Sequence, residues 1–150
     1  MSDFKLARIL APTDRSAFSQ MAVNYARELA KQFGAELHVL RVTDDEEKAL
    51  AQYAVTGVID ASQPQDDYNR WVAELVGETG DVRRVEAVRV ATDIPEAILR
   101  YAKHNDIDLI VMATHGRTGL THLLMGSVAE KVVRSAPCPV LTLRPETLPA

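Results

Sequence analysis

The sequence has almost no cysteine and no excess of basic charge, and each shortage excludes a class of protein. Its single cysteine, Cys138, cannot form an intrachain disulfide, so a disulfide-stabilised scaffold is excluded. Seventeen lysines and arginines stand against 21 aspartates and glutamates, which gives a net charge of −4. Proteins that bind nucleic acid usually carry a basic stripe, and none is visible here. We therefore expect no nucleic-acid partner.

Long apolar runs are also missing. No stretch approaches the length of about 18 apolar residues that a membrane-spanning helix needs, and residues 1–10 show no apolar leader with a cleavage site. We therefore predict no membrane partner and a cytoplasmic location. Cys138 lies between Pro137 and Pro139 at the start of an apolar run, which favours a buried structural thiol over a nucleophile.

The common nucleotide-binding motifs are absent too. The chain has no GxxxxGK[ST] phosphate-binding loop, and Lys131 lies too far into its predicted helix to replace the lysine of that loop. No GxGxxG follows the first predicted strand, where a dinucleotide-binding fold would need it. Both of these nucleotide-binding classes are therefore disfavoured.

What the sequence does have is a regular alternation of strand and helix patterns. Strands are predicted at residues 6–11, 36–43, 82–91, 107–112 and 139–143, the first of them stopping at Pro12. Helical spacing of apolar residues occurs at residues 18–33, 68–76, 94–101 and 127–136. No internal repeat or linker interrupts the order. The alternation predicts a single α/β domain over residues 1–150, with a doubly wound sheet of five parallel strands and helices on both faces.

Several residues are typical of helix ends. Asp14 and Ser16 are both able to cap the first helix, and Gly34 is expected to stop it. Asp93 and Glu96, and later Ser127 and Glu130, have the three-residue spacing of a capping box. These signals support the helix boundaries that the apolar spacing predicts.

In such a sheet, a ligand binds beyond the carboxyl ends of the strands, at the point where the strand order reverses. Two loops qualify by content: residues 12–14 after the first strand, and residues 112–127 after the fourth. If those two strands are neighbours, both loops face one crevice.

The second loop has the content of an anion site. Gly116, Gly119 and Gly126 allow the backbone to approach a ligand closely, and Gly126-Ser127 opens a helix whose first N–H groups favour an anion. Ser127 could donate its hydroxyl to a phosphate, and Arg117 could supply charge. The alternative is that Ser127 is only the helix N-cap and the glycines only shape a long connection. His115 and His122 flank the glycines but lack a third metal ligand nearby.

The spacing in this loop resembles the signature G-x2-G-x9-G-[ST] of the universal stress protein family. The chain has Ala113-x2-Gly116-x9-Gly126-Ser127, and the resemblance extends through the blocks ILAPTDRS, GAELHVLRV, IDLIVMATHGRTGL and GSVAEKVVRSAPCPVL. It covers essentially the whole chain. The resemblance implies a Rossmann-like sheet with strand order 3-2-1-4-5.

The resemblance also implies an ATP site, with Mg²⁺ or Mn²⁺ accompanying the phosphates. Adenine would be recognised by the main chain of the first loop and of the second strand's end, with Asp14 as an acceptor for the base or ribose. Ribose and triphosphate would lie along the second loop. By position the implied site residues are Pro12, Thr13, Asp14, Val42, Ala113, Gly116, Arg117, Gly126, Ser127 and Val128.

Two residues depart from the family pattern. Ala113 replaces the first glycine of the signature, which is tolerable where φ is negative. Arg15 stands where the family often has glycine, and pointing to solvent is the favoured interpretation over reaching a phosphate. The adenylyl-transferring enzymes of the same fold carry a HIGH-type histidine pair and an SGGxDS loop, and both are missing here.

The function that the resemblance implies is an ATP-binding switch or sensor in a stress response, with at most slow ATP hydrolysis. Two alternatives stay open: a stress protein without nucleotide that acts only through protein partners, and a nucleotide hydrolase or transferase, for which no acid/base or metal constellation is visible. Partner proteins are not identifiable from the sequence. Family members commonly pair their last strands across a two-fold axis, so we expect a homodimer through residues 139–143.

Overall fold

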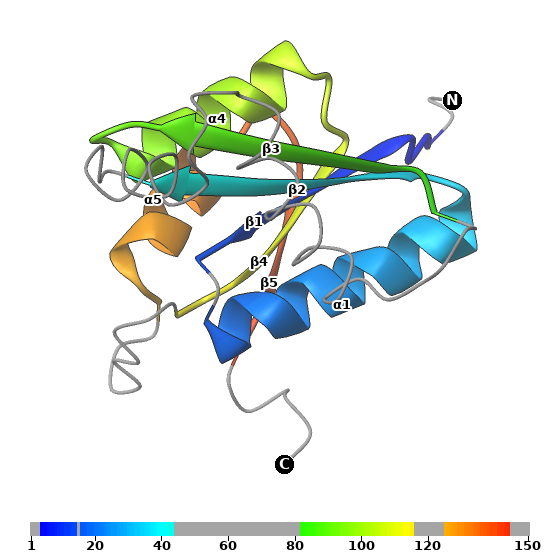
Figure 1. The fold of residues 1–150 in the computed structure, drawn as a ribbon, viewed down its shortest axis with the longest axis horizontal. Helices are drawn as coiled ribbons and strands as arrows, with labels where there is room; N and C mark the ends of the chain where they lie inside the picture. The colour runs from blue at the N-terminus through cyan, green and yellow to red at the C-terminus, as the bar shows by residue number, and fades with distance from the viewer. Residues whose placement is uncertain (1–3, 15, 44–81, 116–124, 145–150) are drawn as a thin grey trace, which may run out of the picture.

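The computed structural model describes residues 4–14, 16–43, 82–115 and 125–144, and within them it has five strands and three helices (Figure 1). In chain order these are β1 (Arg8–Thr13), α1 (Ala17–Phe33), β2 (Glu36–Thr43), β3 (Arg84–Val90), α4 (Ile94–His104), β4 (Leu109–Ala113), α5 (Ser127–Ser135) and β5 (Val140–Leu143). The helix predicted at residues 68–76 lies outside the described residues.

The five strands form one parallel sheet in the order β3-β2-β1-β4-β5, which confirms the predicted topology. Helix α1 covers one face, and α4 and α5 cover the other (Figure 1). The first face buries Ala22, Val23 and Ala26 of α1 among residues such as Ile9, Leu37 and Val39. The second buries Ile98 and Val132 among Leu10, Leu40 and Ile110. The predicted arrangement of helices on both faces is therefore confirmed.

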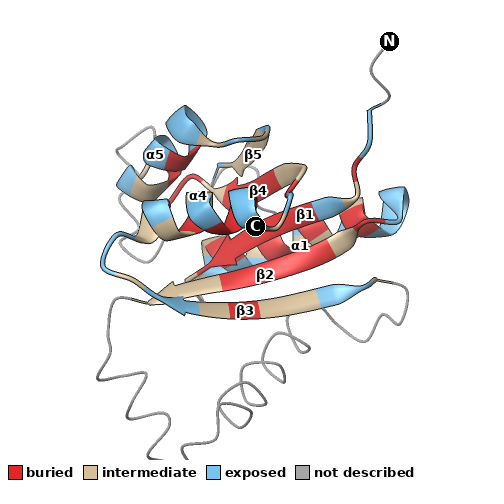
Figure 2. Ribbon diagram, turned by 90° about the horizontal axis from the view of Figure 1, so that it is seen from above, coloured by how far each residue is buried: buried red, intermediate tan, exposed pale blue. Residues whose placement is uncertain are grey.

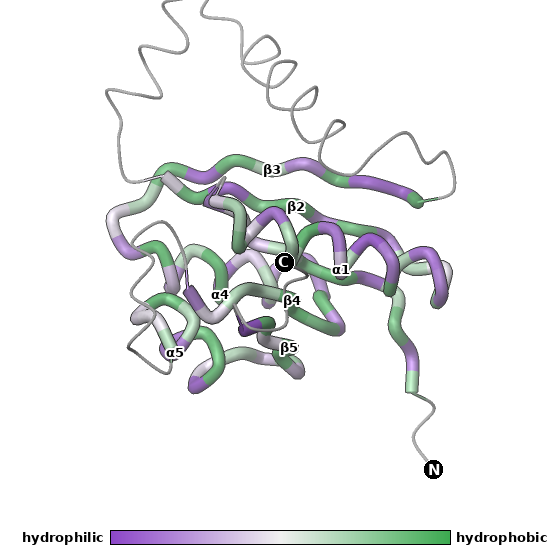
Figure 3. Tube along the Cα trace, turned by 90° about the horizontal axis from the view of Figure 1, so that it is seen from below, coloured by the Kyte–Doolittle hydropathy of each residue, from purple (hydrophilic) through white to green (hydrophobic). Residues whose placement is uncertain are grey.

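Burial concentrates in the central strands β1, β2 and β4, as Figure 2 shows. Their central residues are buried because helices cover both faces of the sheet, and β4 is a continuous apolar run for the same reason. The outer strand β3 has one buried residue, Ala87, and Figure 3 shows hydrophobic and hydrophilic positions mixed along it. That pattern agrees with an edge strand that is only half covered.

The predicted end of the first strand is wrong, because β1 continues through Pro12 to Thr13. Along a strand, the N–H and C=O groups of successive residues point alternately to one neighbouring strand and to the other. The Asp108 N–H, just before β4, donates to the Arg8 carbonyl, so the backbone groups of Arg8 face the β4 side. Pro12, four residues on, therefore has its nitrogen on the β4 side. Pairing with β4 covers only Ile9 and Leu10. A missing N–H at Pro12 thus removes no ladder bond.

Other strand boundaries differ from the prediction by one or two residues. Residues 82–91 shorten to Arg84–Val90, residues 139–143 to Val140–Leu143, and residues 107–112 shift to Leu109–Ala113. The second strand matches its predicted bounds. Apolar side chains outside the ladder, such as Ile107, are buried without belonging to a strand, so hydrophobicity alone overextends the prediction.

The first helix is capped at both ends by the predicted residue types. The Ser16 side chain accepts a hydrogen bond from the Ser19 N–H at 3.1 Å, so of the two candidates Ser16 is the N-cap. The Asp14 carboxylate instead accepts the N–H of Ser16 at 2.9 Å. Gly34 ends the helix in the left-handed region, with φ of 64°. None of the described helices is both long enough and apolar enough to cross a membrane.

Candidate functional site

The loops that follow β1 and β4 begin at the same edge of the sheet. The two strands are parallel neighbours, with Ile9 opposite Leu109 and Leu10 opposite Ile110. The order of the strands reverses between them, because β2 follows on one side and β5 lies on the other. This is the position where open α/β sheets bind ligands, and the structure confirms the condition that the sequence left open.

At the end of β1 the chain turns through a tight group of hydroxyl and carboxylate bonds. The Thr13 and Ser19 hydroxyl oxygens are 3.0 Å apart, and the Asp14 N–H donates to the Ser19 hydroxyl at 3.3 Å. Thr13 and Ser19 are both buried. The side chain of Asp14 is half-buried and bonded to the Ser16 N–H, so it is held within the turn into α1.

Val42 lies at the same edge, one residue past the pairing of Thr13 with Arg41. Its half-buried side chain packs against the core on the α4 and α5 side. Pro12, Thr13, Asp14 and Val42 therefore come together at the ends of two adjacent strands.

On the other side of this edge, the start of α5 lies against the end of β4. The Gly126 N–H donates to the Thr114 carbonyl at 2.6 Å. A Cβ added to Gly126 would lie 3.0 Å from the same carbonyl oxygen. The close approach of the two backbones explains why glycine stands at this position.

The N-terminus of α5 differs from those of the other two described helices. Ser16 caps α1 and Asp93 caps α4 through their side chains, but Gly126 caps α5 with no side-chain hydrogen bond. Ser127 is the first residue of the helix rather than its cap. The interpretation of Ser127 as an N-cap, with Glu130 completing a capping box, is therefore wrong, because the bond from Gly126 to Thr114 already fixes the boundary one residue earlier.

A helix start that no side chain caps, called uncapped below, suits an anion. The first helical hydrogen bond is made by Glu130, whose N–H donates to the Gly126 carbonyl, so Ser127, Val128 and Ala129 precede it in the first turn. Their N–H groups and the helix dipole favour negative charge. Ser127 is exposed, and among residues 127–130 its hydroxyl is the side-chain group that can donate a hydrogen bond.

Ala113 is the last residue of β4 and is half-buried. Among the residues that the structure describes, Asp106 is the one non-glycine residue with positive φ, at 51°. Ala113 is therefore outside the left-handed region, and its Cβ adds no backbone strain. Gly116 and Arg117 lie outside the described residues, as do Arg15, Gly119 and His122.

The sequence-based prediction did not anticipate the hydrogen bonds of two buried residues at this edge, Thr114 and His115. The Thr114 hydroxyl oxygen lies 2.9 Å from Nδ1 of His115 and donates to the Leu143 carbonyl at 3.3 Å. Thr114 is 2% exposed and His115 is 6% exposed. A polar pair placed directly after an apolar strand was the signal that could have singled out Thr114.

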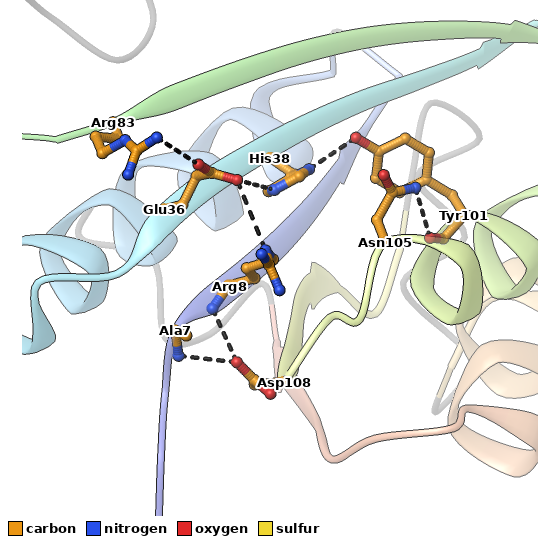
Figure 4. Close-up of polar contacts among 8 residues, drawn as sticks. All are labelled: Ala7, Arg8, Glu36, His38, Arg83, Tyr101, Asn105 and Asp108. Atoms are coloured by element: carbon orange, nitrogen blue, oxygen red, sulfur yellow. Dashed lines mark hydrogen bonds and ion pairs between the residues drawn. The ribbon is translucent and has the colours of Figure 1, made fainter.

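A second polar cluster lies at the opposite, amino edge of the sheet (Figure 4). The buried His38 imidazole bridges the Glu36 carboxylate and the Tyr101 hydroxyl, at 2.7 Å to each. Arg8 and Arg83 flank the same carboxylate at 3.9 and 3.7 Å. Burial raises the pKa of the Tyr101 phenol, which stays protonated at neutral pH. These groups bond one another, so this cluster joins strands and helix α4 rather than presenting chemistry to a ligand.

Two further kinds of group bear on the candidate site: the thiol of Cys138 and the side chains that could bind a metal. Cys138 is half-buried and free, and burial raises the pKa of its thiol, which disfavours the reactive thiolate. Within the described ranges, His, Cys, Asp and Glu side chains form no group of three or more that could hold a metal ion.

Comparisons with known proteins agree on one family. The model of the "Universal stress protein family" matches residues 5–144. Universal stress protein MJ0531 of Methanocaldococcus jannaschii is 33% identical over 150 residues, covering 91% of this chain and 81% of the relative. Among solved structures, universal stress protein UspA from Lactobacillus plantarum superposes with a TM-score of 0.74 at 28% identity, covering 95% of this chain and all of the other.

Two further solved structures with the same fold contain a nucleotide. One is a universal stress protein in complex with cAMP, with a TM-score of 0.68 and 21% identity over 94% of this chain and 98% of the other. The other is the universal stress protein from Archaeoglobus fulgidus in complex with dAMP, with a TM-score of 0.64 and 17% identity over 93% of this chain and 98% of the other.

Proposed function

Because this chain belongs to the universal stress protein family, we propose that it binds ATP at the carboxyl edge of its sheet and acts as a nucleotide-dependent switch or sensor in a stress response. The observation that carries the proposal is the uncapped start of α5, held against the end of β4 by the bond from Gly126 to Thr114. The ends of β1 and β2 lie at the same edge and would hold the base.

The nucleotide would lie across the strand order's reversal point. Adenine and ribose would contact the main chain of Thr13, Asp14 and Val42, and the phosphates would meet the first turn of α5 beside Ser127. Universal stress proteins of the same fold bound to cAMP and dAMP support an adenine nucleotide. The choice of ATP comes from the loop signature that ends in Gly126-Ser127.

A divalent cation would arrive with the phosphates. Mg²⁺ and Mn²⁺ prefer oxygen ligands, and among the site residues that the structure describes the Ser127 hydroxyl and the Asp14 carboxylate are candidate side-chain oxygens. Asp14 is already bonded to the Ser16 N–H. The phosphates and water would therefore supply most of the ligands, and the chain's own part is to hold the phosphates. With Asp14 tied into the turn, we propose that any ATP hydrolysis is slow.

Titration of the purified protein with Mg-ATP tests the proposal, and Ser127→Glu is the discriminating variant. A carboxylate in the first turn stabilises the helix through its dipole by about 0.3–1 kcal/mol but repels phosphate. We expect the variant to unfold at the same or a higher temperature while binding ATP at least ~10-fold more weakly, a loss of about 1.4 kcal/mol. Isothermal titration calorimetry and a thermal melt measure the two effects separately.

Ser135→Glu provides the matched control, because it makes the same change at the other end of the same helix. It should leave the affinity for ATP unchanged. If the wild-type protein binds no ATP, the proposed function is wrong. If Ser127→Glu binds ATP as the wild type does, the phosphates lie elsewhere.

We also propose that two copies pair through β5. Among the described strands, this one is at the end of the sheet order and pairs with β4 alone, and its four residues are half-buried. Strands left open at a sheet edge are prone to pair with another chain. A two-fold axis beside β5 would extend the sheet into the second copy.

A further inference from the structure

Thr114 makes hydrogen bonds in two directions at the edge that carries the proposed nucleotide site. Its N–H donates to the Leu143 carbonyl at 2.9 Å, and its hydroxyl donates to the same oxygen at 3.3 Å. Its own carbonyl accepts the Gly126 N–H at 2.6 Å. Leu143 is the last residue of β5, and Gly126 is the N-cap of α5. One buried residue therefore joins the end of the edge strand to the start of the proposed phosphate-binding helix.

The contact on the Gly126 side leaves little room for independent movement. The space between Gly126 and the Thr114 carbonyl would not admit even a Cβ without a shift of the backbone. The contact on the Leu143 side is made twice, by the backbone and by the hydroxyl. These contacts provide a route by which a displacement of Gly126 would reach Thr114 and then Leu143.

The Thr114 hydroxyl also contacts His115. The hydroxyl oxygen lies 2.9 Å from Nδ1 of His115 and 3.3 Å from the Leu143 carbonyl oxygen. The hydroxyl therefore contacts both the residue that enters the loop from β4 and the end of β5.

We propose that Thr114 couples the two proposed activities, so that nucleotide binding at α5 and pairing of β5 with a second copy strengthen each other. The inference rests on the proposed function. Phosphate at the start of α5 would hold Gly126 in place, and through Thr114 the end of β5 would be held as well. A strand end that is already ordered loses less entropy when it pairs. The coupling is reciprocal, so pairing also tightens nucleotide binding.

Sedimentation of the protein with and without Mg-ATP measures the coupling as the ratio of two dimer dissociation constants. In the wild type we expect ATP to tighten the dimer by at least about 5-fold, the lower end of typical allosteric coupling. Thr114→Val keeps the branched shape and the backbone bonds but removes the hydroxyl. It should bring the ratio below about 2-fold, and Thr114→Ser, which restores the hydroxyl, should bring it back.

Thr92→Val is the matched control, because it makes the same change at an exposed position between β3 and α4 and should leave the ratio at the wild-type value. A second measurement needs no variant: Mg-ATP should slow hydrogen exchange of the Thr114 amide, which donates to Leu143.

The outcomes separate the two proposals. Wild-type protein that binds no ATP in calorimetry contradicts the proposed function and the coupling with it. A second outcome overturns the coupling alone. In it, the wild type binds ATP and Ser127→Glu shows the expected loss of affinity, but ATP changes neither the dimer dissociation constant nor the exchange of the Thr114 amide. A ratio that survives in Thr114→Val also overturns the role of the hydroxyl.

Discussion

Asp93 is the residue at which two helices meet through one carboxylate. One oxygen accepts the Glu96 N–H at 3.0 Å and caps α4, and the other pairs with Lys131 of α5 at 3.2 Å. The bond from the Glu96 N–H, and then the pairing with Lys131, lower the pKa of Asp93 from its ordinary value of 3.8. Because the folded state binds the proton less readily than the unfolded chain, this carboxylate stabilises the fold above its unfolded pKa, and the effect is lost as the pH falls through the lower, folded value.

Asp93→Asn should therefore weaken the fold at neutral pH and not in strong acid. Asparagine is also a good N-cap, so the substitution keeps the cap and removes only the charge. We expect the variant to melt at a lower temperature than the wild type at pH 7, with the difference vanishing by about pH 2. Thermal melts across this pH range measure it. Lys131→Gln, which removes the partner and keeps the carboxylate, should show a smaller loss at pH 7; an equal and pH-independent loss in both variants would contradict this account.

The candidate site was predictable at the level of single residues only in part. The start of a helix near Gly126 and Ser127 follows from residue types and spacing, but its lack of a side-chain cap does not. Nor does the role of Thr114, because its partners Leu143 and Gly126 are distant in sequence and become neighbours only in the folded sheet. The N-cap of α5 is Gly126, which makes this contact, and not Ser127, although Ser127 and Glu130 have ideal capping-box spacing.

At the scale of elements, the end of α1 depends on one backbone conformation. Gly34 has φ of 64°, and an added Cβ would meet no atom within 4 Å. The cost of a side chain there is therefore backbone strain alone. Gly34→Ala should lower the free energy of unfolding by about 1–2 kcal/mol, measured by denaturant titration. Gly34→Asn should cost less, because asparagine tolerates the left-handed region; equal losses in the two variants would mean that something other than φ decides.

Element type and order were predictable because the periodicity of apolar residues reflects which faces are covered. Element ends were less so. The strand through Pro12 shows why: proline usually ends a central strand, but here the missing N–H faces a side where pairing with β4 has already ended after Leu10. The point at which two neighbouring strands stop pairing depends on the whole sheet, so no local sequence pattern predicts it.

At the scale of the molecule, the β5 edge leads to the proposed homodimer. Leu141 and Leu143 turn their backbone groups to β4, so Thr142 between them turns its N–H to the open side. Thr142→Pro removes that donor and should give a monomer in sedimentation equilibrium, where the wild type should have twice the 16.5 kDa mass of the chain.

Val90→Pro is the control for this prediction. It places proline at an outward-facing position of β3, the strand at the other end of the sheet. The dimer should survive that change. A wild-type protein of 16.5 kDa, or a Thr142→Pro variant that remains dimeric, would show that β5 is not the pairing edge.

The whole-molecule arrangement was the most predictable part. Alternation of strands and helices gave a doubly wound sheet, and the resemblance supplied the order that the structure confirms. Placing Pro12, Val42 and Ser127 at one edge followed from that order, because parallel strands end together. The contributions of Gly116 and Arg117 stay predictions, since both lie outside the described residues.

The position of β1 has a consequence for synthesis of the chain. The side chain of Asp108 accepts the N–H groups of Ala7 and Arg8, across sequence separations of 101 and 100 residues (Figure 4). At about 5–20 residues per second, a ribosome takes roughly 5–20 s to reach Asp108 after it has made Ala7. During that interval β1 can pair with β2 but not with β4. A nascent chain thus carries β1, whose residues from Ile9 to Thr13 are all buried in the folded sheet, with one edge unpaired, and it is in this window that a chaperone would gain most by binding it.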